Sequence, residues 1–326
     1  MSHKRPRKVQ RSHAFKLSRK QLYAVAIITV IAVSSLAIYA FFTQGSSSQF
    51  KAAIVDQLSS REDFKNATFV KTANATLTVA GYMVTYYKGS EVTVDFYRNL
   101  PKQGYKVVIL RVHSALYNGT DAPLDLFTSE PFNPNDPDTI YYLSRGYLDA
   151  AMYQQGGDQF FGIKHSFISN AMLGNFDDAV IIMMGCNGLD KYARSKATLD
   201  AFLGKGAKVV IGWDDAVGVD HTDIATAALL RRLLIENQTI KNAVNATNMD
   251  VGPDPTYHSV LKYYPSTSSI DSYTVPHSLS KSTNVTDAFS IFGTMIFSAL
   301  PVLLYMKKFL VSKGLECRLF EFLVML

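Results

Sequence analysis

The 326-residue sequence has two cysteines and lacks the short motifs that identify several large enzyme classes. It contains no G-x-S-x-G nucleophile elbow, no Walker loop and no C-x-x-C pair. The stretch Gly204-Lys-Gly206 stands between a predicted helix and a predicted strand, which is the wrong order for a dinucleotide-binding loop. We therefore expect no cofactor, and no motif in the sequence specifies a metal.

The body of the chain has no excess of positive charge. The sequence has 33 basic and 27 acidic residues, for a net charge of +6, but residues 1–20 hold eight basic residues and no acid. Residues 307–326 hold four basic and two acidic residues, which leaves 21 basic and 25 acidic residues between these ends. A nucleic-acid binder carries its positive charge on the folded domain, so that class is excluded. A hydrophobic content of 48% also excludes a disordered chain.

Two long apolar runs predict membrane spans. Leu22–Phe42 has 21 residues without a charged side chain, enough to cross a bilayer, and it exceeds the 7–15 apolar residues of a signal peptide, the alternative considered. Residues 288–306 form a second run, for which a buried core helix is the alternative. Basic residues precede the first run and follow the second, which predicts that both termini are cytoplasmic.

This topology predicts a two-pass protein of the cell membrane that contacts the lipid bilayer. The predicted segments are a basic tail (1–21), a transmembrane helix (22–42), an extracytoplasmic domain (45–287), a second transmembrane helix (288–306) and a cytoplasmic tail (307–326). Six N-glycosylation motifs fall between the spans, at Asn66, Asn74, Asn118, Asn237, Asn245 and Asn284. Cys186 and Cys317 then lie on opposite sides of the membrane, so the domain has no internal disulfide and depends on its hydrophobic core.

Strand-like and helix-like segments alternate through the predicted domain. Predicted strands are 52–55, 82–87, 105–112, 179–184 and 207–213, and predicted helices are 92–100, 191–203 and 223–236. Continuous apolar strands are typical of parallel sheets that are buried on both faces. The pattern predicts an α/β fold with a doubly wound, mostly parallel sheet in which 105–112 and 179–184 are neighbours. Residues 115–178 are interpreted as an insertion or surface subdomain.

Two reactive side chains follow these two predicted neighbours. His113 comes directly after the first strand, and Cys186 comes two residues after the second. Because ligands bind at the carboxyl ends of parallel strands, a thiol and an imidazole at this edge suit a nucleophile and its base. Cys186 also precedes a predicted helix, whose N-terminal amides would favour the thiolate. The alternative is a buried cysteine and an unrelated histidine. His165 and His258 are less favourably placed as bases.

Acidic residues gather after the strand 207–213. Asp214, Asp215, Asp220, His221 and Asp223 fall within ten residues. Carboxylates in such a loop could bind a hard cation, which leaves a metal-dependent hydrolase as one alternative. A solvated loop is the other interpretation.

The segments VIIMMGCNG, GKGAKVVIGWDDAV and HTDIATAALLRRLL, with LRVHSALYNG upstream, resemble caspase-like cysteine peptidases of the caspase–hemoglobinase fold. The similarity is nearest to separases and CHAT-type peptidases and covers roughly residues 50–250. It implies a catalytic dyad of Cys186 and His113. It also implies an oxyanion site from the amides of Cys186 and of Ser114, which stands where the family usually has glycine. Substrate-binding residues implied by the same resemblance are Trp213, Asp214, Asp220 and Asp223.

These observations predict an extracytoplasmic, membrane-anchored cysteine endopeptidase. The acidic residues after the strand 207–213, Asp214 first among them, imply a preference for a basic residue before the cut. A catalytically inert surface receptor or assembly module on the same fold is the second hypothesis. The metal-dependent hydrolase that uses the Asp/His loop is the third.

Overall fold

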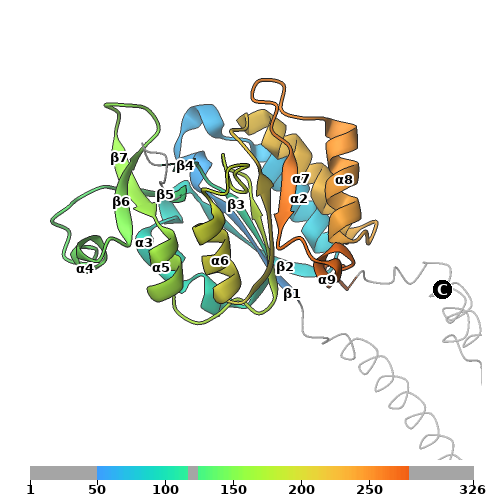
Figure 1. Cartoon of the computed structure of the whole chain (residues 1–326), viewed down its shortest axis with the longest axis horizontal. Coiled ribbons are helices and arrows are strands. Elements are labelled where there is room, and N and C mark those ends of the chain that lie inside the picture. The colour runs from blue at the N-terminus through green and yellow to red at the C-terminus, as the bar shows by residue number, and fades with distance from the viewer. Residues whose placement is uncertain (1–49, 117–123, 279–326) are drawn as a thin grey trace, which may run out of the picture. The chain divides into compact units, whose positions relative to one another are not determined.

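Continuous apolar segments form the centre of a mixed six-stranded sheet in the computed structural model, which describes residues 50–116 and 124–278. The strand order is β10-β9-β8-β3-β1-β2, and all pairs are parallel except β10 with β9 (Figure 1). The strands are β1 (Phe50–Asp56), β2 (Tyr82–Lys88), β3 (Tyr105–Arg111), β8 (Ala179–Met183), β9 (Ala207–Trp213) and β10 (Leu261–Tyr264). The predicted adjacency of the strands before His113 and Cys186 is confirmed, since β3 and β8 pair in parallel.

Helices cover both faces of this sheet because its side chains alternate between two cores. Val108 and Leu110 face one core, and Val107 and Ile109 face the other. The first core is covered by α3 (Val94–Asn99), α5 (His165–Asn170) and α6 (Lys196–Gly204). The second is covered by α2 (Ala67–Val79), α7 (Val219–Leu234) and α8 (Ile240–Val251), and α9 (Ser268–Asp271) follows β10.

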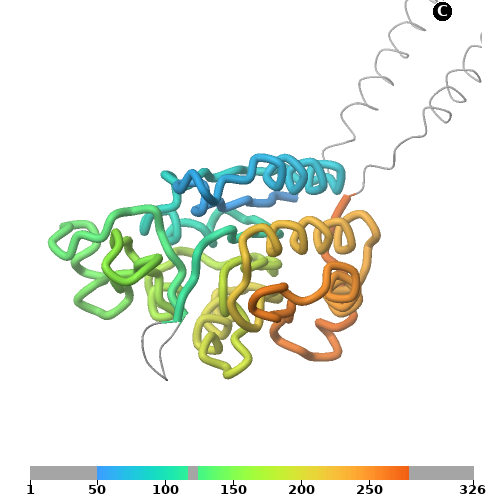
Figure 2. The backbone as a smooth tube through the Cα atoms, turned by 90° about the horizontal axis from the view of Figure 1, so that it is seen from above, coloured from blue at the N-terminus to red at the C-terminus, as the bar shows by residue number. Residues whose placement is uncertain are grey.

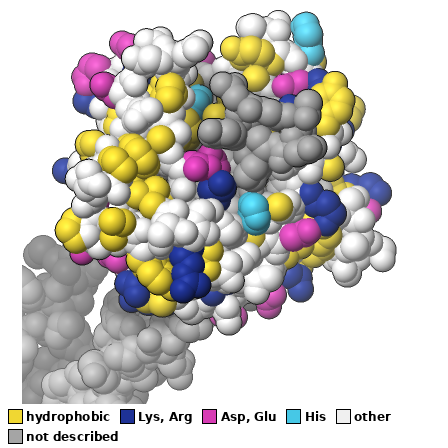
Figure 3. Space-filling model, turned by 60° about the vertical axis from the view of Figure 1, so that its left-hand side comes forward, with side chains coloured by type: hydrophobic (Ala, Val, Ile, Leu, Met, Phe, Trp, Pro, Cys, Tyr) yellow, Lys and Arg dark blue, Asp and Glu magenta, His cyan; other side chains and the backbone are white. Residues whose placement is uncertain are grey.

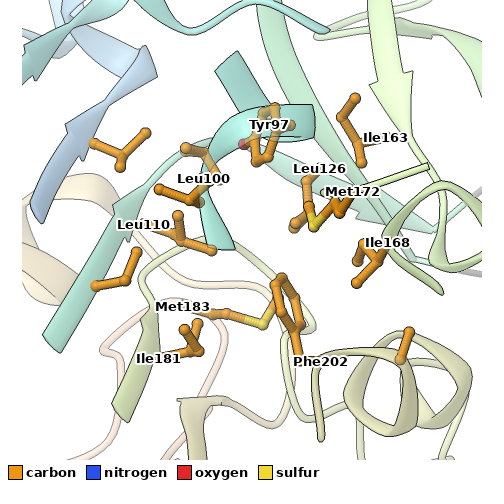
Figure 4. Close-up of a cluster of buried hydrophobic side chains, with 14 of the residues drawn as sticks. Tyr97, Leu100, Leu110, Leu126, Ile163, Ile168, Met172, Ile181, Met183 and Phe202 are labelled. Atoms are coloured by element: carbon orange, nitrogen blue, oxygen red, sulfur yellow. The ribbon is translucent and has the colours of Figure 1, made fainter. Parts of the chain in front are cut away.

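A second sheet occupies the region that was interpreted as an insertion. Its antiparallel order is β4-β5-β7-β6, and the sheet lies at one side of the molecule in Figure 1. The strands are β4 (Ser114–Leu116), β5 (Leu124–Pro131), β6 (Leu148–Met152) and β7 (Gln159–Ile163), with α4 (Ile140–Ser144) between β5 and β6. Leu126 and Ile163 point toward Leu110 and Met183 of the central sheet in Figure 4. The region therefore shares the main hydrophobic core and is not a separate surface subdomain.

The described chain begins and ends beside the same side chain. The ring of Phe50 packs 5.8 Å from that of Tyr82, centroid to centroid. The hydroxyl of Tyr82 donates to the carbonyl of Pro276, and the Ser278 amide donates to the carbonyl of Ala80. The blue start and the orange end of the tube accordingly lie near each other in Figure 2.

The prediction of a two-pass membrane protein is corrected by the structure. Among residues 50–116 and 124–278, no helix is both long and apolar enough to cross a membrane. The fold class is thus an α/β fold with a mixed sheet and no flanking transmembrane helices in the described chain, and the predicted localisation loses its structural basis. The segments on which this prediction rested, 22–42 and 288–306, lie outside the described residues.

The helix after Cys186 begins later than predicted. It starts at Lys196 instead of Lys191. The amides of Asn187, Leu189 and Lys191 donate to the carbonyls of residues 213–215, at and just after the end of β9, so this stretch lies alongside that segment. The Asp190 carboxylate then accepts from the amides of Tyr192 and Arg194 at 2.9 and 3.0 Å. Both sets of bonds compete with the helical hydrogen-bond pattern and delay the helix.

Candidate functional site

Parallel pairing of β3 and β8 brings the segments of His113 and Cys186 to the carboxyl edge of the central sheet. Val107 pairs with Val180 and Leu110 with Met183. The alignment continues one step beyond the last pair, since the Met184 amide donates to the Leu110 carbonyl at 3.0 Å. His113 and Cys186 follow the ends of β3 and β8 by two and three residues. The strand pairing therefore brings the two segments to the same edge of the sheet, and the contact of their side chains stays a prediction.

A hydrogen bond holds the two segments together beyond the strands. The Ser114 hydroxyl donates to the Cys186 carbonyl at 2.7 Å. Gly185 makes this contact possible, because a Cβ at that position would collide with the Ser114 hydroxyl and the Val112 carbonyl. The Gly-Cys and His-Ser dipeptides thus touch through backbone and hydroxyl groups.

The Cys186 thiol is half-buried and lies against the loop that follows β9. The Val217 amide donates to the sulfur at 3.5 Å, and the sulfur lies 3.8 Å from the Val217 carbonyl oxygen. Burial raises the pKa of the Cys186 thiol, and the carboxylates of Asp254 and Asp215 raise it too, while the amides of Val217 and Cys186 lower it. The expected helix N-terminus is ten residues away, at Lys196, so it does not favour the thiolate. At neutral pH the resting group is the thiol.

The His113 imidazole lies between two aromatic rings. Its centroid is 4.6 Å from that of Phe127 and 4.8 Å from that of Tyr153. Burial lowers the pKa of His113 to about 4, and the positive charge of Arg61 contributes in the same direction. The ring is therefore neutral at pH 7 and able to accept a proton. Among the described residues, no hydrogen bond joins this ring to the Cys186 sulfur.

The backbone amides nearest the sulfur differ in part from the predicted oxyanion pair. The amides of Cys186 and Val217 both act on the thiol. Ser114 is fully buried and pairs with Leu126 as the first residue of β4. Val217 carried no sequence signal, because it reaches the site only through the fold of the loop after β9.

A buried ionic triad lies beneath the site. The Arg111 guanidinium donates to Asp223 through Nε and Nη2, both at 2.8 Å, and to Asp56 through Nη1 at 2.7 Å. It also donates to the Phe64 carbonyl at 2.8 Å, and Asn66 donates to the same Asp223 carboxylate at 2.9 Å. Burial raises the pKa of Asp223, which Arg111 and Asn66 lower. Both carboxylate oxygens of Asp223, which was predicted to line a substrate pocket, accept from Arg111.

The other predicted substrate-binding residues take different positions. Trp213 is buried in the core, with its indole N–H donating to the Thr222 hydroxyl at 2.8 Å. Asp220 is exposed in the first turn of α7. Asp214 is half-buried and follows β9 directly, and its Oδ1 accepts from the Val260 amide at 2.9 Å. The Asp214 Oδ2 makes no hydrogen bond among the described residues.

Asp254 is an acid near the thiol that the sequence analysis missed. Its side chain is buried, and its carboxylate accepts from the amides of Gly218, Thr256 and Tyr257 at 2.8–2.9 Å. These bonds lower the pKa of Asp254 against the effect of burial. Asp215 is instead paired with Lys191 at the surface. The Asp-Pro-Thr turn at 254–256 was a turn signal, but nothing in it indicated proximity to Cys186.

Among the other described histidines, His221 is near enough to Asp254 to lower the pKa of that carboxylate. His165 begins α5, and His258 is exposed in the turn after Asp254. His221 packs its ring 5.3 Å from that of Trp213, centroid to centroid. Within the described parts of the chain, no group of three or more His, Cys, Asp or Glu side chains converges as a metal site requires. The acidic residues of the loop that was considered as a cation site therefore do not converge on one point.

The predicted glycosylation sites divide into three groups. Asn74, Asn237 and Asn245 are exposed. Asn66 is the N-cap of α2, accepts from the Phe69 amide at 3.0 Å and donates to Asp223, so its side chain is already engaged. Asn118 and Asn284 lie outside the described residues.

One face of the domain is mixed in polarity. The face in Figure 3 intersperses basic, acidic and hydrophobic side chains. A cleft of about 860 Å³ opens at the carboxyl ends of β1 and β2, where Asp56, Tyr86 and Lys88 contribute to its wall. Neither His113 nor Cys186 lines that cleft. The site is therefore defined by strand register and side-chain contacts and not by this cleft.

No model of a known protein family matches the sequence, and no curated protein matches it significantly. The resemblance to caspase-like peptidases remains a prediction that rests on the quoted segments.

Proposed function

We propose that the chain is a cysteine peptidase in which Cys186 is the nucleophile and His113 is its base. The observation that carries the proposal is the parallel pairing of β3 and β8, which brings the segments of the two residues to the same carboxyl edge. The Ser114–Cys186 hydrogen bond supports it by holding the two segments in contact. In the proposed resting state the imidazole is neutral and the thiol is protonated, and the imidazole takes the thiol proton during the reaction.

The proposed reaction proceeds through a thioester. His113 accepts the Cys186 proton as the sulfur attacks the peptide carbonyl carbon, and the carbonyl oxygen becomes an oxyanion. The amides of Cys186 and Val217, which lie beside the sulfur, are the donors for that oxyanion. The carbon–nitrogen bond then breaks, and the leaving amine takes the proton from His113. A water molecule, deprotonated by His113, attacks the thioester and releases a carboxylate and the thiol.

A basic residue before the cut is the specificity we propose. Asp214 is the predicted acid that best keeps a free carboxylate oxygen while being half-buried, since Asp223 is committed to Arg111. A charge-assisted hydrogen bond is worth about 1.5–3 kcal/mol, so Asp214→Asn should reduce kcat/KM for Arg substrates roughly 10-fold or more. Asp138→Asn, which changes an exposed acid before α4, is the matched control. A library profile that prefers acidic or apolar residues in the native chain would refute this specificity.

The decisive test of the peptidase proposal uses an electrophilic peptide probe on the full chain with Cys317→Ser, which leaves one thiol. Labelling and peptide cleavage should both disappear in Cys186→Ala and fall strongly in His113→Ala. His165→Ala, which changes a histidine on α5, should retain both. Cleavage that survives Cys186→Ala would refute the proposal.

A non-catalytic binding module is the second candidate, and one observation favours it. Burial raises the pKa of the Cys186 thiol, and the helix that would favour the thiolate starts ten residues later. A thiol in that state reacts slowly with electrophiles. If iodoacetamide modifies Cys186 only above pH 9 and no peptide is cleaved, this candidate is preferred.

A further inference from the structure

Gln57 occupies the point where the strand order of the central sheet reverses. It follows β1 directly, and β1 lies between β2 and β3 in the sheet. Ligand sites in open α/β sheets form at this kind of switch point, outside the carboxyl ends of the strands. Gln57 is nevertheless fully buried, with no exposed surface. A buried amide at such a place must have its polar atoms satisfied by the protein.

The Gln57 side chain satisfies all of its polar atoms with groups around His113. Its Oε1 accepts from the His113 backbone amide at 3.0 Å. Its Nε2 donates to the Tyr153 hydroxyl at 2.6 Å and to the Thr128 carbonyl at 3.3 Å. One side chain thus links the end of β1 to three segments, which are His113 beyond β3, Thr128 in β5 and Tyr153 beyond β6.

Two of these three partners determine the position of the imidazole. The His113 amide fixes the backbone from which the ring extends, and Tyr153 forms one side of the ring's pocket at 4.8 Å. Phe127 forms the other side, and its ring is 5.3 Å from that of Tyr153. Arg61 lies over the Tyr153 ring at 4.7 Å and is the charged group that acts on His113. Removing the Gln57 bonds would free Tyr153 to move away from the imidazole.

We propose that Gln57 is a positioning residue that, with Tyr153, holds the His113 imidazole in the orientation needed for proton transfer. This inference rests on the proposed function for its catalytic part. Gln57 does not touch the thiol or the reacting carbonyl in this arrangement, and it acts only through His113 and Tyr153. Displacement of a catalytic group by about 1 Å can cost roughly 100-fold in rate, so the effect should fall on kcat.

Two variants and one matched control separate positioning from general stability. Gln57→Met keeps the volume of the side chain and removes all three hydrogen bonds. Tyr153→Phe keeps the ring and removes the hydroxyl that Gln57 contacts, so it tests the same idea if Gln57→Met folds poorly. Tyr105→Phe is the control, because the hydroxyl of the buried Tyr105, at the far end of β3 from His113, shares a hydrogen bond of 2.7 Å with the Tyr87 hydroxyl and does not contact the ring pocket. All three are made in the full chain.

The first readout is the titration of the His113 ring by NMR, assigned with His113→Asn among the seven histidines. The native ring should titrate near pH 4, and Gln57→Met and Tyr153→Phe should move its pKa toward the ordinary value of about 6.5 as the pocket loosens. Tyr105→Phe should leave the titration unchanged. The second readout is peptide cleavage, where both variants should lose kcat roughly 10- to 100-fold with KM unchanged.

An unchanged His113 titration in both variants would overturn the inference. So would a changed titration with kcat equal to that of Tyr105→Phe. If the native chain cleaves no peptide, the proposed function fails, and the NMR titration alone still decides whether Gln57 holds the ring.

Discussion

Replacing Arg111 by methionine should destabilise the fold far more than replacing an exposed arginine. Arg111 has no exposed surface and makes three hydrogen bonds at 2.7–2.8 Å to the buried carboxylates of Asp56 and Asp223. Methionine fills a similar volume but leaves both acids without their cation. Breaking a buried ion pair by removing one partner costs about 3–5 kcal/mol.

The loss is large against the total stability of such a domain, which is about 5–15 kcal/mol. For domains of 150–250 residues each kcal/mol corresponds to roughly 2–4 °C, so Tm should fall by roughly 6–20 °C. Urea unfolding followed by circular dichroism at pH 7 measures the free energy directly. Arg231→Met is the matched control, because the Arg231–Glu236 pair is largely exposed and such pairs contribute about 0–1 kcal/mol.

The pH dependence of the free energy of unfolding provides a second test of the same triad. Without Arg111, the pKa of Asp223 should rise further, because burial already raises it and Arg111 is the main group that lowers it. Protonated carboxyls need no cation, so the deficit of Arg111→Met should shrink as the pH is lowered through the acid range. If Arg111→Met loses no more free energy than Arg231→Met at pH 7, the triad does not stabilise the fold.

Two further predictions concern the segments that carry the site. Gly185→Ala should destabilise the fold by about 1–3 kcal/mol, because the new Cβ collides with the Ser114 hydroxyl. Gly204→Ala is the control and should be neutral or slightly stabilising, because a Cβ has open space there at the end of α6. Urea unfolding measures both changes in the free energy of unfolding. His113 should make stability fall as the pH is lowered from about 6.5 to about 4, because the unfolded imidazole binds a proton in that range while the folded one, with its pKa lowered to about 4, does not. His113→Asn should flatten this part of the curve, and an unchanged curve would contradict the buried, neutral ring.

The sequence alone predicted the central strands and that the segments of His113 and Cys186 lie at the same edge of the sheet. The runs 105–112 and 179–184 are continuously apolar, so they had to be buried on both faces, and the structure pairs them in parallel as β3 and β8. Adjacent parallel strands end at the same edge, which is why the segments of His113 and Cys186 could be placed together before any coordinates. The prediction of flanking transmembrane helices had no such constraint from pairing, and it finds no support in the described residues.

Only the tertiary structure decided what surrounds each reactive group. Asp223 lies on the best amphipathic helix of the chain, yet its role depends on Arg111, which is 112 residues away in sequence and lies under the same edge. The local hydrophobic pattern predicts which face of a helix is buried, but it does not predict which charged side chain will pack against that face. Gln57, Tyr153 and Val217 carried no motif at all, because each acts through a contact made by loops from separate strands. The sequence determined the hydrophobic periodicity and therefore the strands. The pairing of the buried polar groups was decided by tertiary packing, because each such group needs a hydrogen-bond partner within the fold.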